Sequence, residues 1–246
     1  QADSLPLPAE RLRAAVAALA NDYTGVAVVM ADPAAARPLL QEAWRQSVEP
    51  ATRLVYAHVL AVLGDAAGVD DLAAAVDAQP KWDAGWNYRA MGQFGSDMSR
   101  LDSYVVALGR TRNPRALPSL LRLTERLDAE TDFSHHRAAA LALESLADRR
   151  AAPVLAAVLR KPGMSGHALT DLPSATAAHT KLDPSLTALA PRRLSLRELY
   201  LARALCRCGD EDGLGERLLT AYLQDVRGHF ARHAKAVLDE GSSASR

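Results

Sequence analysis

Aromatic residues are scarce in this chain: they make up 5% of its 246 residues, whereas hydrophobic residues of all kinds make up 49%. A core of this composition must be built mainly from Ala, Leu and Val. Ala and Leu favour helix, and small side chains let helices approach one another closely. A chain of this length can bury a sizeable core, and its composition favours an all-α protein.

Net charge is also absent, because 29 basic residues balance 29 acidic ones. Without a global electrostatic field, neither nucleic acid nor a membrane surface is an expected partner. No apolar run reaches the length of a transmembrane helix. The chain begins at Gln1 rather than Met, which we interpret as the result of processing or excision. A removed signal peptide and a lost upstream domain both fit.

Signatures of metal and cofactor binding are lacking as well. Cys206 and Cys208 lie two apart on one predicted helix and point to different faces, which suits neither a disulfide nor a zinc site. His229 and His233 share a helix face, but the glutamate of a metalloprotease motif is missing between them. Phosphate loops, nucleophile elbows and dinucleotide fingerprints do not occur. The sequence therefore predicts no metal and no cofactor within this chain.

The chain does contain a repeated pattern, an amphipathic segment rich in Ala, Leu and Val that ends in Gly, Asp or a close substitute. It occurs at residues 53–65, 101–113, 136–148, 198–210 and 229–241. A second apolar helix follows four of these segments, and such a helix pair must stack on its neighbours to bury its apolar face. The unit resembles the HEAT-type repeat of the phycocyanobilin-lyase class. We predict an α-solenoid of about five HEAT-like helix pairs, one domain over residues 1–246, with an N-terminal capping helix near residues 8–21.

Two insertions interrupt the repeats, at residues 79–99 and 162–193, and a flexible tail is expected at 241–246. Each insertion comes just before the long helix of the next unit, at the edge where the long helices begin. Insertions confined to one face of a repeat array often mark the binding face. The first insertion holds four of the twelve aromatic residues. We therefore expect this edge to be functional and residues 79–99 to pack beside His135.

Candidate binding residues gather at this edge. They are Trp86, Asn87, Tyr88, Arg89, Gln93 and His167 in the insertions, and His135, His136, Arg137 and Tyr200 near the starts of long helices. Helix N-termini favour anions, so the groove edge is expected to be locally cationic and its residues to contribute little to the core. Adjacent helical residues point about 100° apart, so at most one of His135 and His136 can face the core squarely. Arg53 and Arg197 fit the repeat consensus and are expected to be structural.

Four motifs resemble one family of proteins. They are Gly85 to Gly95 (GWNYRAMGQFG), Phe133 to Arg137 (FSHHR), Lys161 to Ala168 (KPGMSGHA) and Arg227 to Ala234 (RGHFARHA). The set is similar to the C-terminal helical region of bacterial FAD-dependent oxidoreductases, some of which are called xanthan lyases. The resemblance implies a periplasmic or extracellular protein linked to polysaccharide degradation, with FAD held only by an upstream domain. It also implies that one site is formed by Asn87, Tyr88, Arg89, Gln93, His135, His136, Arg137 and His167.

Two functions remain open. The first is a binding module whose groove edge holds an acidic oligosaccharide, a protein or a neighbouring domain. The second is a carbohydrate-active enzyme of the polysaccharide lyase type. Its base would be Tyr88 or His135, its carboxylate-neutralising group Arg89 or Arg137, and its acid His136 or Tyr200. A repeat fold carries no reaction by itself, so the binding module ranks first and enzymatic activity is left open.

Overall fold

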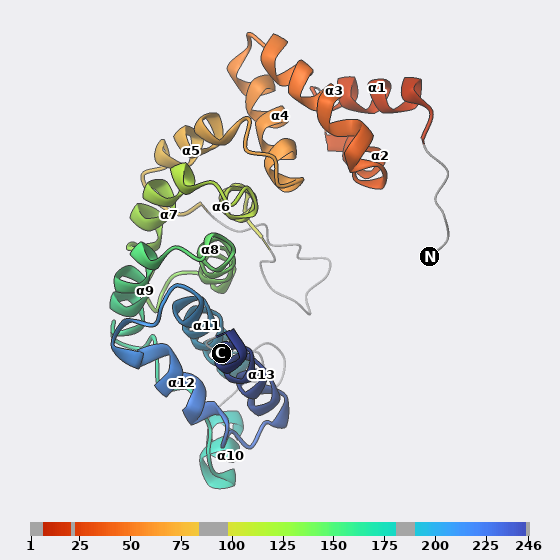
Figure 1. The fold of residues 1–246 in the computed structure, drawn as a ribbon. Coiled ribbons are helices and arrows are strands. Elements are labelled where there is room, and N and C mark those ends of the chain that lie inside the picture. Colours follow the sequence, from red (N-terminus) through yellow and green to blue (C-terminus); the bar gives the residue numbers. More distant parts are fainter. Residues whose placement is uncertain (1–6, 21–22, 84–97, 181–189, 245–246) are drawn as a thin grey trace.

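The computed structural model describes residues 7–20, 23–83, 98–180 and 190–244, which form thirteen α-helices and no β-strand (Figure 1). The prediction of an all-α protein is confirmed for these residues. None of the described helices combines the length and the apolar character needed to cross a membrane.

Nine of the helices form two rows along a curved arc. The inner row holds the long helices α4 (Pro50–Val62), α6 (Arg100–Arg110), α8 (Phe133–Leu146), α11 (Ala190–Arg207) and α13 (Gly228–Ala244) (Figure 1). The outer row holds the short helices α5 (Val69–Asp77), α7 (Leu117–Thr124), α9 (Ala152–Leu159) and α12 (Leu214–Tyr222). Successive long helices contact one another, as do α5, α7 and α9. All five segments predicted as long helices are therefore helical.

The repeated Gly-Asp ending has a structural cause. Just after each of four long helices the backbone takes a positive φ, at Gly64 (75°), Arg112 (51°), Ala147 (49°) and Gly209 (108°). The side chain of the next residue then accepts a hydrogen bond from a backbone N–H two positions on, over 2.9–3.0 Å at Asp65, Asn113 and Asp148. Glycine takes a positive φ without steric cost, and Asp or Asn stabilises the turn that follows. This pair of residues directs the chain from the inner row to the outer row.

Small residues let the long helices pack tightly. A Cβ atom added to Gly109 in α6 would lie 2.3 Å from the Cα atom of Ala142 in α8. The two helices therefore meet almost backbone to backbone, which explains how a core with so few aromatic residues is filled. The main cluster of buried residues spans α4 to α11 and consists largely of Ala, Leu and Val.

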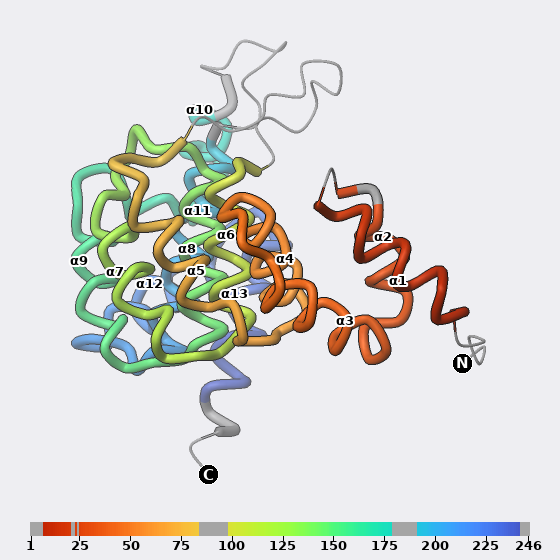
Figure 2. The backbone as a smooth tube through the Cα atoms, turned by 90° about the horizontal axis from the view of Figure 1, so that it is seen from above, coloured from red at the N-terminus to blue at the C-terminus, as the bar shows by residue number. Residues whose placement is uncertain are grey.

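The N-terminal end of the chain forms a separate group of helices, α1 (Ala9–Ala18), α2 (Val26–Ala31) and α3 (Pro33–Gln46), with the short 3₁₀ turn η1 (Tyr23–Gly25). Figure 2 shows this group at one end of the arc. Leu12, Val16 and Leu40 pack there against Leu60 of α4, which joins the group to the rows. The predicted N-terminal helix corresponds to α1.

Two predicted boundaries are corrected by the structure. The second insertion is not wholly a loop, because residues 162–193 contain the helix α10 (Leu172–Thr180) and α11 already begins at Ala190. The tail predicted from residue 241 is helical up to Ala244, where α13 ends. Residues 84–97 of the first insertion lie outside the described residues.

Candidate functional site

Half of the predicted site residues can be placed. Trp86, Asn87, Tyr88, Arg89 and Gln93 lie outside the described residues, and their predicted roles stay predictions. The other five are described: His135, His136, Arg137, His167 and Tyr200. The structure divides these five between a closed region of buried polar contacts and an open strip on the inner side of the arc.

His136 is a core residue rather than a groove-edge residue, so this expectation is wrong. Its side chain is completely buried, and its ring nitrogens lie 3.0 Å from the carbonyl oxygen of Asp132 and 2.9 Å from that of Asp128. Burial and the nearby charge of Arg197 lower the pKa of His136 to about 4, against the weaker opposite effect of the two carbonyls. An imidazole enclosed in this way cannot reach a ligand and cannot act as the proposed acid.

His135 is buried as well, but it is paired. Its Nδ1 atom lies 2.6 Å from Oδ1 of Asp102 in α6, and its ring stacks on Trp82 with centroids 4.6 Å apart. Burial alone would lower the pKa of His135, but the hydrogen bond and charge of Asp102, helped by other carboxylates, raise it above its usual value. The pair joins α8 to α6 and anchors the start of the first insertion. Trp82 thus lies beside His135, whereas the predicted packing of the rest of this insertion falls on residues outside the described ranges and stays a prediction.

A shallow hollow of about 680 Å³ opens at this edge, lined in part by Trp82 and His135. Its charged side chains are of both signs: Lys81, Arg126, Asp83, Glu130 and Asp132. Three carboxylates face two permanent cations, so the expectation of a locally cationic edge is not met at this hollow.

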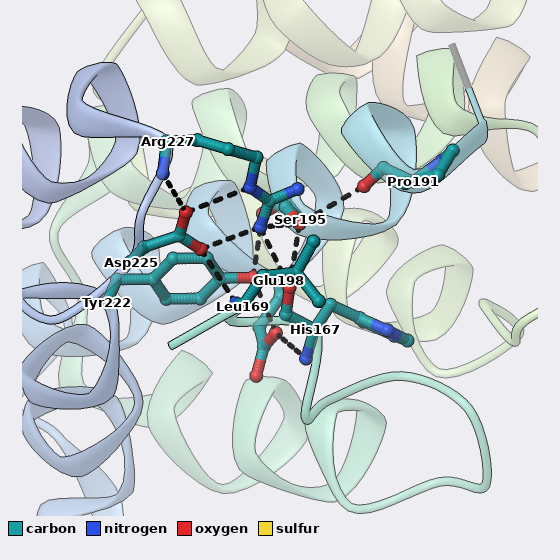
Figure 3. Close-up of polar contacts among 8 residues, drawn as sticks. All are labelled: His167, Leu169, Pro191, Ser195, Glu198, Tyr222, Asp225 and Arg227. Atoms are coloured by element: carbon teal, nitrogen blue, oxygen red, sulfur yellow. Dashed lines mark hydrogen bonds and ion pairs between the residues drawn. The ribbon is translucent and has the colours of Figure 1, made fainter. Parts of the chain in front are cut away.

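His167 belongs to a buried polar network that fastens the second insertion to α11 and α12 (Figure 3). Glu198, only 1% exposed, accepts hydrogen bonds from the backbone N–H groups of Gly166 and His167, each over 2.8 Å, and from the hydroxyl of Tyr222 over 2.7 Å. Burial raises the pKa of Tyr222, and the nearby negative charge of Glu198 raises it further. The backbone of His167 is therefore fixed by a hydrogen bond to a buried side chain.

A second part of the same network is built around Arg227. Its guanidinium forms an ion pair with Asp225 over 2.6 Å and donates to the carbonyl oxygen of His167 over 3.0 Å and to Oγ of Ser195 over 2.9 Å (Figure 3). Asp225 in turn accepts from the backbone N–H of Leu169 over 2.9 Å. These bonds are made within the protein, and they identify the network as a structural clamp.

Arg53 and Arg197, which were expected to be structural, make contacts within the protein. Arg53 forms an ion pair with Asp71 over 3.0 Å and donates to the carbonyl oxygen of Trp44 over 3.1 Å. Arg197 donates to the carbonyl oxygens of Ala129 and Gly163, and only 4% of it is exposed. Both side chains tie together segments that are distant in the sequence.

Arg137 and Tyr200, by contrast, lie together on an open surface, which we call the inner strip. It consists of Phe133, Arg137, Glu144, Tyr200, Arg203 and Arg207. The rings of Phe133 and Tyr200 have centroids 6.1 Å apart. The guanidinium of Arg137 lies 5.8 Å from the first ring, and that of Arg203 lies 5.1 Å from the second. Cations and aromatic faces therefore alternate across two neighbouring helices.

The position of the strip follows from helix periodicity. Its members are spaced by three, four or seven residues along α8 and α11, which keeps them on one face of each helix, and they are partly or fully exposed. The flanks of α8 contact α6 and α11, and its back contacts α7 of the outer row. The remaining face of α8 is turned toward the inner side of the arc (Figure 1).

One end of the strip borders a hollow of about 660 Å³ lined by Arg112, Glu144, Arg203 and Arg207, together with apolar and small residues of α8. Arg203 forms an ion pair with Glu144 over 2.8 Å, and Arg207 forms one with Glu240. Three arginines surround one glutamate in this hollow. With the partner Glu240 counted as well, the arginines outnumber the carboxylates by one, so the hollow carries a small excess of positive charge.

Sequence reasoning named Arg137 and Tyr200 but missed their neighbours Phe133, Arg203 and Glu144. A usable signal was present. Positions 133, 137 and 144 of α8 and positions 200, 203 and 207 of α11 repeat at helical spacing outside the apolar positions of each helix. Grouping the polar positions of α8 and α11 by helix face would have identified the inner strip.

Comparisons with protein-family models, curated proteins and solved structures find no match to this chain. Among the described residues, no group of three or more His, Cys, Asp and Glu side chains is placed to hold a metal ion. The function must therefore be inferred from the geometry alone.

Proposed function

We propose that the two rows of helices are an α-solenoid of about five HEAT-like pairs and that the chain is a binding module for an anionic ligand, with an acidic oligosaccharide as the first candidate. The observation that carries this proposal is the inner strip, where Arg137 and Arg203 lie over the rings of Phe133 and Tyr200.

The chemistry of the strip suits such a ligand. Aromatic faces pack against the apolar faces of sugar rings, and guanidinium groups recognise carboxylates through paired hydrogen bonds. The side chains of Arg203 and Glu144 are 19% and 23% exposed, so their ion pair is partly shielded from water but open to exchange. A ligand carboxylate that takes the place of Glu144 would keep Arg203 paired.

A partner protein or domain is the second candidate for the same surface. Arginine and aromatic side chains are also enriched at protein interfaces, and the strip lies on the inner face that repeat proteins commonly use. The family resemblance also predicts export, a link to polysaccharide degradation and FAD held by an upstream domain. These points stay predictions.

The enzyme alternative is weaker at the described residues. The 2.6 Å contact between His135 and Asp102 is an arrangement that could orient a base. However, the side chain of His135 is only 3% exposed, and Trp82 covers one face of its ring. We therefore assign this pair to the scaffold.

Calorimetric titration tests the proposal. The chain should bind a galacturonate tetramer at least about tenfold more tightly than a neutral glucose tetramer of equal length, and added salt should weaken that preference. Equal affinity for the two would contradict an anion site. If the chain binds neither tetramer but binds a protein partner, and Arg203→Gln abolishes that binding, the strip is assigned to a partner domain instead.

A further inference from the structure

A separate pocket lies where the N-terminal helices meet the inner row. It has a volume of about 430 Å³ and is lined by Tyr23 of η1, His58 of α4, and Met98, Ser99, Arg100, Ser103 and Tyr104 at the start of α6. None of these residues belongs to the inner strip or to the predicted site. The pocket is therefore independent of the proposed function.

Three of the seven residues that line this pocket carry aromatic rings, and these rings contact one another. The ring of His58 makes edge-to-face contacts with Tyr104, at a centroid distance of 4.9 Å, and with Tyr23, at 5.9 Å. At the mouth, Tyr23 is 42% exposed and Met98 is 45% exposed. Two large apolar side chains left open beside a pocket indicate a surface that an apolar group would cover.

The polar atoms at the base of the pocket are already satisfied. Nδ1 of His58 lies 3.3 Å from the hydroxyl of Tyr23, and Nε2 lies 3.0 Å from the hydroxyl of Ser103. A neutral imidazole can donate to one hydroxyl and accept from the other. This chain of hydrogen bonds fixes the aromatic wall and adds no charge to it.

The one permanent charge at the pocket is Arg100. Its Nε donates to the hydroxyl of Tyr104 over 2.9 Å, and the guanidinium lies 5.7 Å from the centroid of that ring. Within the described part of the chain this guanidinium interacts with the hydroxyls of Tyr104 and Tyr23 and with the charge state of His58, and no ion pair there joins it to a carboxylate. A half-open aromatic pocket thus has a cation at its rim with hydrogen-bonding capacity to spare.

We propose that this pocket binds a small aromatic carboxylate, with its ring between Tyr23, Tyr104 and Met98 and its carboxylate on Arg100. The aromatic wall selects a flat apolar body, because ring faces and edges pack favourably at these distances. The guanidinium selects an anion over a neutral or cationic analogue, because it offers paired donors to a carboxylate.

The test uses the full chain and three probes of one shape: 2-naphthoate, the neutral 2-naphthamide and the cationic 2-naphthylmethylamine. Titration followed by calorimetry or by ligand NMR should give at least about tenfold tighter binding of the naphthoate than of the amide, with the amine weakest.

Two variants on the same helix sharpen this test. Arg100→Gln should reduce naphthoate affinity about tenfold and leave the amide unchanged, whereas Arg110→Gln, an exposed position at the other end of α6, should change neither. Thermal unfolding followed by circular dichroism checks that both variants are folded. Equal affinities for naphthoate and amide, no binding of naphthoate up to about 5 mM, or equal loss in both variants would overturn the proposal.

Discussion

The closed region around His136 and Glu198 and the inner strip lie on the same two helices, α8 and α11, and contain similar residue types, yet they differ in burial. In the closed region, His136 near the start of α8 and Glu198 in the middle of α11 are at most 1% exposed, and their polar atoms contact the protein's own groups. On the strip, Arg137, Tyr200 and Arg203 are partly exposed. Histidines, arginines and aromatics gathered at one edge therefore do not make a binding site when their side chains are buried inside the protein.

The largest effect that separates the two regions should come from Glu198→Gln. The new amide group would face donors where the carboxylate now accepts three hydrogen bonds, so we expect a loss of about 4 kcal/mol in the free energy of unfolding. Urea unfolding followed by circular dichroism measures it. The exposed control Glu125→Gln should change stability by less than about 0.5 kcal/mol. A loss below about 1 kcal/mol at Glu198 would mean that the region is not a structural clamp.

Protonation provides the next test, of the closed region through His135 and His136 and of the N-terminal pocket through His58. Burial lowers the pKa values of His58 and His136 to about 4, whereas both would be near 6.5 in the unfolded chain. Their contribution to stability is therefore complete above pH 6.5 and is lost as the pH falls toward 4, by up to about 3 kcal/mol for each ring.

The stability contributed by His135 should depend on pH in the opposite direction, because the pKa of His135 is raised in the folded protein. Its contribution is complete below pH 6.5 and is lost as the pH rises through the folded pKa. NMR titration of the imidazole rings should find His135 titrating well above the other two. Protonation of His136 at pH 6 in the folded protein would contradict the buried, neutral assignment.

A smaller effect should appear on the open strip. Glu144→Gln removes the carboxylate that competes for Arg203, so we expect affinity for an acidic oligosaccharide to rise about threefold. Glu130→Gln removes the same charge from the hollow at the helix starts and should leave the affinity unchanged. Calorimetry with both variants makes the comparison. A larger gain in affinity in Glu130→Gln than in Glu144→Gln would place the ligand at the hollow beside His135 and contradict binding at the inner strip.

Much of the fold could be predicted because it repeats. The five long helices and the Gly-Asp turns follow from a pattern that recurs at each unit, whereas α2, α3 and α10 were not foreseen. The first of these has only six residues, and α10 lies in a stretch rich in Gly, Ser, Thr and Pro, where local sequence signals argue against a helix.

The site was predicted less well because burial depends on distant partners. Asp102 is 33 residues from His135, and the carbonyl groups that enclose His136 come from a turn whose path the sequence pattern does not reveal. Arg137 and Tyr200 are partly exposed, and their predicted binding role stays a prediction, but the sequence grouped them with neighbours that face the core. Helical spacing could have separated the two faces, whereas only the tertiary structure reveals which edge atoms are already bonded.

The most direct test compares Arg203→Gln on the inner strip with Lys81→Gln at the hollow beside His135, both titrated with one galacturonate tetramer at low salt. Each variant removes one positive charge, so general electrostatics changes equally. We predict that Arg203→Gln weakens binding about tenfold and that Lys81→Gln stays within about twofold of the unmodified chain. The reverse pattern, or an equal loss in both, would contradict the claim that the inner strip is the binding surface.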